Sequence, residues 1–307
     1  MTDRPHVPVM LPEVLGALSP ADGGVYIDGT FGAGGYTNGI LNAANCHVMG
    51  IDRDPTAIEN GQKLISEFDG RLKLIQNCFG NVADCVDGQI DGFVLDIGVS
   101  SMQLDQAERG FSFMRDGPLD MRMGEGESAA ELIARIDEED LANLIYKYGE
   151  ERQSRKIAKA IVEVRVEMPF ETTLQLANVI EKATPRRWGD KIHPATRTFQ
   201  ALRIAVNDEL GELERALDAS IKVLKTGGRL VVVTFHSLED RIVKNFLKEN
   251  SDKITSTNKY SNEEKNVTKP FSLIGRKAVL ASRDEAKVNP RARSAKLRAA
   301  IRTEVVV

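Results

Sequence analysis

The chain has few of the residues that build metal centres and disulfide frameworks. Its 307 residues include only three cysteines (Cys46, Cys78 and Cys85) with no C-x-x-C pair, and they cannot all be disulfide-bonded. Its four histidines are widely scattered and show no metal-ligand spacing. We therefore expect no structural zinc, no other metal at the site, and a reducing compartment.

Long apolar runs are also missing. No run approaches the length of a membrane span, and the segment Met1-Thr-Asp-Arg-Pro-His has no hydrophobic signal core. The expectation is a cytoplasmic protein without a membrane partner. A hydrophobic content of 42% and a charged content of 28% are ordinary for a globular protein. The length favours one large domain and a smaller one.

Charge is unevenly distributed. The net charge is −4, yet residues 275–302 contain nine basic residues against Asp284 and Glu285, a local excess of +7. Such asymmetry makes an anionic partner plausible at that end, the alternative being a solvated surface.

The most informative stretch runs from Val25 to Gly35. An apolar run ends in Asp28, opens into a glycine-rich loop, and is followed from Tyr36 by a segment that reads as a helix. A second apolar run, 46–51, ends at Asp52, where nucleotide-binding sheets place a carboxylate on ribose hydroxyls. Together they predict the first units of a nucleotide-binding α/β sheet.

The glycine spacing argues against a dinucleotide. Counting G-x-G-x-x-G from Gly32, the last position falls on Thr37, and counting from Gly29, the third position is Phe31. The string Asp28-Gly-Thr-Phe-Gly-Ala-Gly-Gly35 instead resembles the first motif of S-adenosylmethionine-dependent methyltransferases, whose ligand carries no phosphate. A turn that only lets strand and helix pack closely is the alternative.

Apolar runs predict a parallel sheet with helices on both faces, because helix-length segments separate the first four strands. Helical patterns replace strands between 106 and 208, at 138–148, 154–166 and 174–183, and a long helix over 198–224 leads back to the sheet. We predict a discontinuous methyltransferase domain, 1–105 with 209–307, and an inserted helical substrate-recognition domain, 106–208. A polar loop is expected over 250–269. The predicted strands are 25–28, 47–52, 72–76, 92–96 and 229–235.

Asp96 is the candidate catalytic group. It ends the fourth strand, at the sheet edge where ligands of open α/β sheets bind. Methyl transfer requires a nucleophile aligned with the methyl carbon, and an acceptor at Asp96 could draw a hydrogen of an exocyclic amine out of conjugation. A buried capping aspartate is an equally good interpretation of the position alone.

Further candidates follow the other strands. Phe79 could stack on adenine or pack in the core, and Gln103 could bind the cofactor or cap a turn. His236 and Arg241 are candidates for substrate contact, while Ser237 and Asp240 resemble a capping box. In the insertion, Arg197 and Arg203 could meet phosphates or simply face water, with Phe199 packed between them.

Eight longer strings occur along the chain in this order: His6-Val-Pro-Val-Met-Leu-Pro-Glu13, Tyr26-Ile-Asp-Gly-Thr-Phe-Gly32, Ile51-Asp-Arg-Asp-Pro55, Asp96-Ile-Gly-Val-Ser-Ser101, Arg109-Gly-Phe-Ser-Phe-Met-Arg-Asp-Gly-Pro-Leu-Asp-Met-Arg-Met123, His193-Pro-Ala-Thr-Arg-Thr-Phe-Gln200, Phe235-His-Ser-Leu-Glu-Asp-Arg241 and Asn289-Pro-Arg-Ala-Arg-Ser294. Over residues 6–302 they resemble the bacterial ribosomal RNA small-subunit methyltransferase H family. Members of that family transfer a methyl group to the N4 amine of a cytidine in the decoding region of 16S rRNA.

The resemblance implies a class I, Rossmann-like methyltransferase fold, S-adenosylmethionine as cofactor, and 16S rRNA, within the small ribosomal subunit, as partner. A homodimer is left open. Tyr36 stands where the family commonly has histidine. By the resemblance, the cofactor is bound by Gly34, Gly35, Tyr36, Asp52, Phe79, Asp96 and Gln103. The residues expected to bind substrate are His193, Arg197, His236, Arg241, Arg291, Arg293 and Arg298.

Two other chemistries fit the sequence less well. The tandem-proline motif of DNA amino-methyltransferases is absent, since Ile-Gly-Val follows Asp96, and cytosine-C5 methylation requires a cysteine nucleophile that neither the fourth nor the fifth strand supplies. The competing functions are an RNA-binding ribosome-assembly factor that keeps the cofactor structurally, and a methyltransferase of another substrate.

Overall fold

The computed structural model describes residues 8–99, 101–186, 189, 192–252 and 268–304. The chain forms two compact units, Met1–Gly98 with Leu210–Val307, and Val99–Glu209. The second unit begins at Val99, whereas the sequence pattern placed the start of the insertion at 106. The predicted loop over 250–269 lies mostly outside the described residues.

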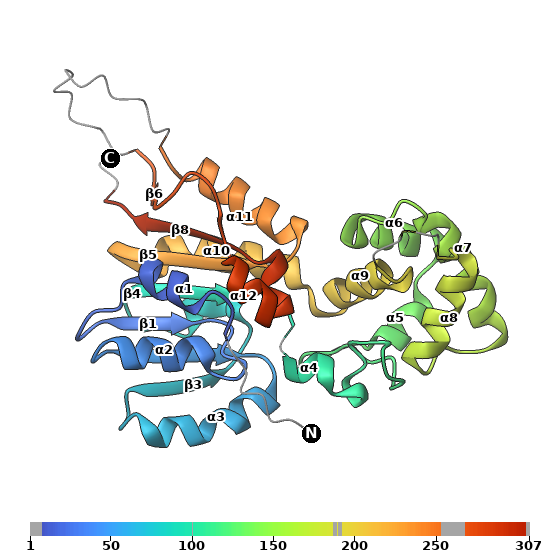
Figure 1. Ribbon diagram of the computed structural model, residues 1–307, viewed down its shortest axis with the longest axis horizontal. Helices are drawn as coiled ribbons and strands as arrows, with labels where there is room; N and C mark the ends of the chain where they lie inside the picture. Colours follow the sequence, from blue (N-terminus) through green and yellow to red (C-terminus); the bar gives the residue numbers. More distant parts are fainter. Residues whose placement is uncertain (1–7, 100, 187–188, 190–191, 253–267, 305–307) are drawn as a thin grey trace. The chain divides into compact units, whose positions relative to one another are not determined.

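The first unit is built on one twisted sheet with the strand order β3-β2-β1-β4-β5-β8-β6, and β7 pairs with β8 (Figure 1). The five strands from β3 to β5 are parallel, and β8 runs antiparallel to β5 and β6. The strands are β1 Val25–Asp28, β2 His47–Asp52, β3 Leu72–Gln76, β4 Ile90–Asp96, β5 Leu224–Thr234, β6 Phe271–Leu273, β7 Val279–Leu280 and β8 Lys296–Arg302.

Helices cover both faces of this sheet because its side chains alternate between two apolar cores. Val94 packs with helices α1, α2 and α3, while its neighbours Phe93 and Leu95 pack with α10 and α11. The carboxyl ends of β1, β2, β4 and β5 therefore meet at one edge. The helical elements of this unit are α1 Leu11–Leu18, α2 Gly35–Ala43, α3 Pro55–Glu67, η1 Phe79–Asp84, α10 Glu209–Val223, α11 Ser237–Glu249, α12 Arg283–Val288 and η3 Pro290–Ser294.

The second unit has helices around its own apolar core, in which Leu141, Ile145, Ile157 and Leu176 are fully buried. Asn207, at the end of α9, binds the loop that contains Met121 and Met123. Its side chain accepts a hydrogen bond from Met123 N (2.8 Å) and donates one to the Met121 carbonyl (2.8 Å). No strand longer than an isolated bridge occurs in its described residues. Its helices are α4 Ser101–Asp105, η2 Ala107–Arg109, α5 Ala129–Arg135, α6 Glu138–Gly149, α7 Ser154–Glu167, α8 Thr173–Ala183 and α9 Ala195–Asn207.

One sequence-based prediction about an element is wrong. The single helix over 198–224 is two helices, because Asp208 adopts a left-handed backbone (φ 48°) and ends α9. Most of the segment 294–301 belongs to strand β8, which pairs with β5. Alternate side chains of a strand point to the same face, so Lys296 and Arg298 lie on one face of β8.

Candidate active site

The glycine-rich loop is anchored by Asp28 at the end of β1. Its fully buried carboxylate accepts hydrogen bonds from Thr37 Oγ1 (2.8 Å), Thr37 N (3.1 Å) and Thr30 N (3.2 Å). Burial raises the pKa of Asp28 to about 6, although these hydrogen bonds lower it. Asp28 therefore fixes both ends of the loop, and its oxygens are used within the protein.

Asp52 closes the other side of the loop from the end of β2. Its Oδ2 accepts from Gly32 N (2.7 Å), and its Oδ1 accepts from Asp54 N (2.9 Å). Burial raises its pKa, and the backbone hydrogen bonds from Asp54 and Gly32 oppose that effect. Gly32 has a positive φ of 52°, and a Cβ there would meet only the Thr30 carbonyl oxygen at 3.8 Å, so this part of the loop leaves room for a ligand.

Gly34 and Gly35 begin α2 and are enclosed on their side-chain faces. A Cβ on Gly34 would lie 2.9 Å from Leu64 Cδ2, and one on Gly35 would lie 2.8 Å from Pro8 Cβ. Tyr36 is buried, and its hydroxyl donates to the Val9 carbonyl (2.6 Å). The Tyr36 side chain thus braces the segment before α1, which leaves its backbone for a ligand.

Asp96 differs from the other two aspartates because one of its oxygens is unused. Its backbone N–H donates to Thr30 Oγ1 (2.7 Å), which ties the end of β4 to the glycine-rich loop. Its Oδ1 is buried and has no hydrogen-bond partner among the residues that the structure describes. Burial raises the pKa of Asp96 to about 8, with further contributions from Asp28 and Glu239, while Arg291 lowers it. Asp96 is positioned to accept a hydrogen bond or a proton from a ligand.

The turn after β5 carries a capping box different from the predicted one. The N-cap of α11 is His236, and the reciprocal residue is Glu239, rather than the pair Ser237 and Asp240. Glu239 Oε2 accepts from Phe235 N (2.7 Å) and His236 N (3.1 Å), and its side chain is completely buried. Histidine is not a usual N-cap residue, so the capping pattern of the sequence gave no signal for it.

The remaining cofactor candidates are divided between the units. Phe79 begins η1 after β3, partly buried, with its Cβ 3.3 Å from the position a Cβ on Gly29 would take. Gln103 belongs to α4 of the second unit, where its side chain is buried. The first unit therefore brings together Gly34, Gly35, Tyr36, Asp52, Phe79 and Asp96, and the role of Gln103 stays a prediction.

The basic candidates of the first unit have unequal surroundings. Asp240 holds Arg298 (Arg298 Nε to Asp240 Oδ1, 2.7 Å) and Lys296 (3.1 Å), and the Arg298 and Asp240 side chains are only 15% and 13% exposed. Arg293 is exposed and donates to the Ala286 carbonyl (3.1 Å). Arg241 is also exposed, and Arg291 is half-buried near Asp96. Arg298 thus forms a structural ion pair with Asp240.

In the second unit, His193 packs against Phe113, with ring centroids 4.7 Å apart, and Phe113 also contacts Phe199 at 4.8 Å. Arg197 is half-exposed and pairs with Glu151 (3.5 Å). Arg203 is bound by Glu209 through two hydrogen bonds of 2.7 and 2.9 Å, so it is not available as a phosphate contact. His193 and Arg197 are close in the chain and on the same unit as an exposed Met114.

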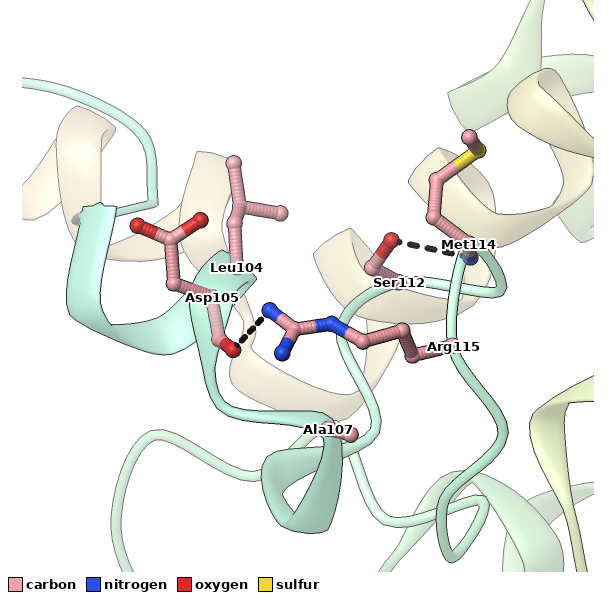
Figure 2. Close-up of a pocket in the computed structure, with 6 residues that line it drawn as sticks. All are labelled: Leu104, Asp105, Ala107, Ser112, Met114 and Arg115. Carbon is pink, nitrogen blue, oxygen red and sulfur yellow. Dashed lines mark hydrogen bonds between the residues drawn. The ribbon is translucent and has the colours of Figure 1, made fainter. Parts of the chain in front are cut away.

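This unit also has a cavity of about 230 Å³ beside the exposed Met114 (Figure 2). Arg115 donates to the Asp105 carbonyl, and Met114 N donates to Ser112 Oγ at 3.2 Å. The residues that line the cavity are Leu104, Asp105, Ala107, Ser112, Met114 and Arg115.

The described residues contain no cluster of histidine, cysteine and carboxylate side chains that could hold a metal ion. None of the described helices is long and apolar enough to cross a membrane.

The geometry of the first unit fits S-adenosylmethionine. The glycine-rich loop offers bare backbone beside Gly32, Asp52 at the end of β2 is bound to that loop, and Asp96 Oδ1 is a buried acceptor without a partner in the described residues. Five parallel strands in the order β3-β2-β1-β4-β5 with an antiparallel β8 beside β5, a glycine-rich first loop, and carboxylates at the ends of β2 and β4 define the class I methyltransferase fold.

Comparison with known proteins identifies the family. The model of the MraW methylase family matches residues 3–303. Ribosomal RNA small subunit methyltransferase H of Parvibaculum lavamentivorans is 58% identical, covering 97% of this chain and 90% of the relative. The enzyme of the same name from Paramagnetospirillum magneticum is 56% identical, covering 99% and 97%. An rRNA methylase structure from Streptococcus thermophilus gives a TM-score of 0.42 at 10% identity, covering 96% of this chain and 92% of that one.

The chain belongs to the MraW methylase family. This confirms the family and the fold class that the sequence predicted, and S-adenosylmethionine as the cofactor. Glu239 is a fully buried carboxylate near this site that was not among the predicted site residues, because nothing in the sequence distinguishes a buried N3 carboxylate from an exposed one.

Proposed function

We propose that this protein methylates the N4 amine of a cytidine in the decoding region of 16S rRNA, within the small ribosomal subunit in the cytoplasm. The observation that carries the proposal is Asp96, a carboxylate with an unused buried oxygen at the carboxyl end of β4 and tied to the glycine-rich loop. The names of the relatives support small-subunit rRNA as the substrate class.

The chemistry suits a carboxylate in this position. S-adenosylmethionine, when bound, supplies an electrophilic methyl group on a sulfonium sulfur. Asp96 accepts a hydrogen bond from the exocyclic amine, and this contact frees the nitrogen lone pair for attack. Asp96 then receives the proton that the methylated nitrogen must lose. Asp52 holds the ribose, and Gly34 and Gly35 approach the methionine end.

Substrate recognition is assigned to the inserted helical domain, proposed as 106–208, and to basic residues of the carboxyl-terminal segment. His193, Arg197, His236, Arg241, Arg291 and Arg293 are the proposed RNA contacts. Positive side chains bind phosphates without reading sequence, so base choice must come from the site itself.

Transfer of labelled methyl to small subunits from a strain that lacks this gene tests the proposal. Nucleoside digestion and mass spectrometry should then yield N4-methylcytidine from one position of 16S rRNA. A methyl group on carbon 5, or on protein, would contradict it. Binding of subunits without any transfer would favour the assembly-factor alternative.

Replacing Arg298 and Arg293 separately with Ala should separate structure from RNA binding. Arg298→Ala leaves the half-buried Asp240 with Lys296 alone, so we expect the free energy of unfolding to fall by about 1 to 3 kcal/mol. Arg293→Ala should leave the free energy of unfolding unchanged within about 0.5 kcal/mol. The slope of the logarithm of RNA affinity against the logarithm of salt concentration should become shallower by about 0.7 to 0.9, the value for one lost phosphate contact. Urea unfolding and RNA binding over a salt series measure both. An unchanged slope for Arg293→Ala would remove it from the interface.

A further inference from the structure

Asp96 Oδ1, at the end of β4, is buried and has no hydrogen-bond partner among the described residues. Glu239 and His236, at the start of α11 after β5, lie against each other, with Glu239 Oε1 2.7 Å from His236 Nε2. Buried polar atoms normally find partners, so the unused oxygen of Asp96 and a second fully buried carboxylate after the adjacent strand need an explanation.

Helix capping does not explain the burial of Glu239. Two other helices of this chain have the same reciprocal cap, with Ser128 and Glu131 at α5 and with Thr172 and Gln175 at α8. Glu131 is exposed, and Gln175 carries no charge. At α5 and α8 the reciprocal cap is thus made by an exposed glutamate and by a glutamine. The fully buried carboxylate of Glu239 costs desolvation free energy that capping does not require.

The surroundings of Glu239 connect it to Asp96. Asp96 ends β4 in register with Val233 of the adjacent parallel strand β5, and Ile97 N donates to the Val233 carbonyl (2.9 Å). Glu239 Oε2 accepts from Phe235 N (2.7 Å), two residues beyond Val233, so both carboxylates lie at the carboxyl end of the same strand pair. The charged and titratable groups that act on Asp96 from neighbouring elements are Asp28 of β1, Tyr36 of α2, Glu239 of α11 and Arg291 of η3. Only Arg291 among them is positive, so Glu239 adds to an already negative environment.

We propose that Glu239, held by its helix cap and by contact with His236, is a positioning residue whose charge makes Asp96 a stronger acceptor for the amine proton. The inference rests on the proposed function. In the transfer, the nitrogen lone pair forms the new N–C bond, and the S–C bond breaks with its electron pair left on sulfur. The surplus proton on nitrogen passes to Asp96 and then to solvent. A more basic Asp96 removes that proton more readily.

The first test needs neither cofactor nor RNA. In protein labelled with ¹³C at the aspartate carboxyl carbons, the Asp96 signal, assigned with Asp96→Asn, is titrated in wild type, Glu239→Gln and Glu131→Gln. Glutamine preserves the cap, as Gln175 shows. We expect the pKa of Asp96 to fall by about one unit in Glu239→Gln, a tenfold loss of proton affinity, and to stay unchanged in Glu131→Gln. An unchanged Asp96 titration in a folded Glu239→Gln protein would overturn the proposal.

The second test measures methyl transfer across pH. Glu239→Gln should move the acidic limb of the rate profile to lower pH and reduce the plateau by about threefold to tenfold, with no change in cofactor affinity. A residue that only caps α11 would leave the profile unmoved. If wild type itself transfers no methyl group to cytidine, the proposed function fails, whereas an altered titration without a shift in the rate profile would refute the role of Glu239 alone.

Discussion

Asp96→Asn should reduce methyl transfer by roughly 100- to 10,000-fold, the contribution typical of a positioned proton acceptor. Asparagine keeps the size of the side chain and one acceptor oxygen, but it cannot take up the proton. Because Asp96 Oδ1 has no partner among the described residues, no hydrogen bond within the described protein is lost at that atom. The fold should therefore persist while turnover collapses.

The same substitution has an expected pH signature. The pKa of Asp96 is raised to about 8 in the folded protein from 3.8, so folding favours the neutral carboxyl. Its contribution to stability is complete below pH 3.8 and is lost as the pH rises through about 8. Asp96→Asn, which stays neutral, should gain melting temperature over wild type progressively across that interval.

Thermal unfolding at several pH values and single-turnover methyl transfer measure the two effects. The matched control is Asp87→Asn, an exposed aspartate before β4, which should change neither quantity. Full activity in Asp96→Asn would assign the proton to backbone, RNA or solvent groups. If Asp96→Asn instead melts below wild type at alkaline pH, the Asp96 carboxylate is stabilised in the fold, which would contradict this prediction.

The parallel half of the sheet was predictable because its signals are local. Strands β1, β2 and β3 have the bounds that the apolar runs indicated, since each run ends in a polar residue or a turn. Strand β4 begins two residues earlier than expected, at Ile90, beside a register shift against β5. The glycine-rich loop and Asp52 follow directly from the same pattern.

The antiparallel edge was not predictable from local pattern. The segment Lys296–Arg302 combines three basic residues with two alanines, a leucine and an isoleucine. This composition is also compatible with a helix, and pairing with β5 makes the segment a strand. The ion pairs of Asp240 with Lys296 and Arg298 also join residues more than fifty positions apart. Apparent phosphate ligands can thus prove structural once the tertiary fold is known.

The break at Asp208 and the burial of Glu239 could not be predicted from the sequence, for a related reason. The helical pattern continues across residue 208, so the left-handed turn there depends on packing of both helices. Glu239 reads as an ordinary acidic residue in the first turn of a helix, and its complete burial is set by the neighbouring strands. The burial of a charged side chain is set by tertiary contacts and is therefore the feature that the sequence predicts least well.

Asp52→Ala should act on cofactor affinity more than on the chemical step. Each charge-assisted hydrogen bond to a ribose hydroxyl is worth about 1.5 to 3 kcal/mol, so S-adenosylmethionine should bind roughly 10- to 150-fold more weakly per lost interaction. The alanine variant also frees Gly32 N and Asp54 N, which Asp52 holds in the protein. Part of the loss would then come from a less ordered glycine-rich loop.

Calorimetric titration with S-adenosylmethionine and with its demethylated product separates Asp52 from Asp96. Both ligands contain the same ribose, so Asp52→Ala should weaken them by similar factors. Asp96→Asn should distinguish them, because only the methyl donor carries the positive sulfonium. Asp52→Asn keeps one acceptor oxygen, enough for the N–H of Gly32 or of Asp54 but not for both, so comparing it with Asp52→Ala shows how much of the effect comes from loop order. Wild-type affinity in a folded Asp52→Ala protein would exclude Asp52 from the cofactor site.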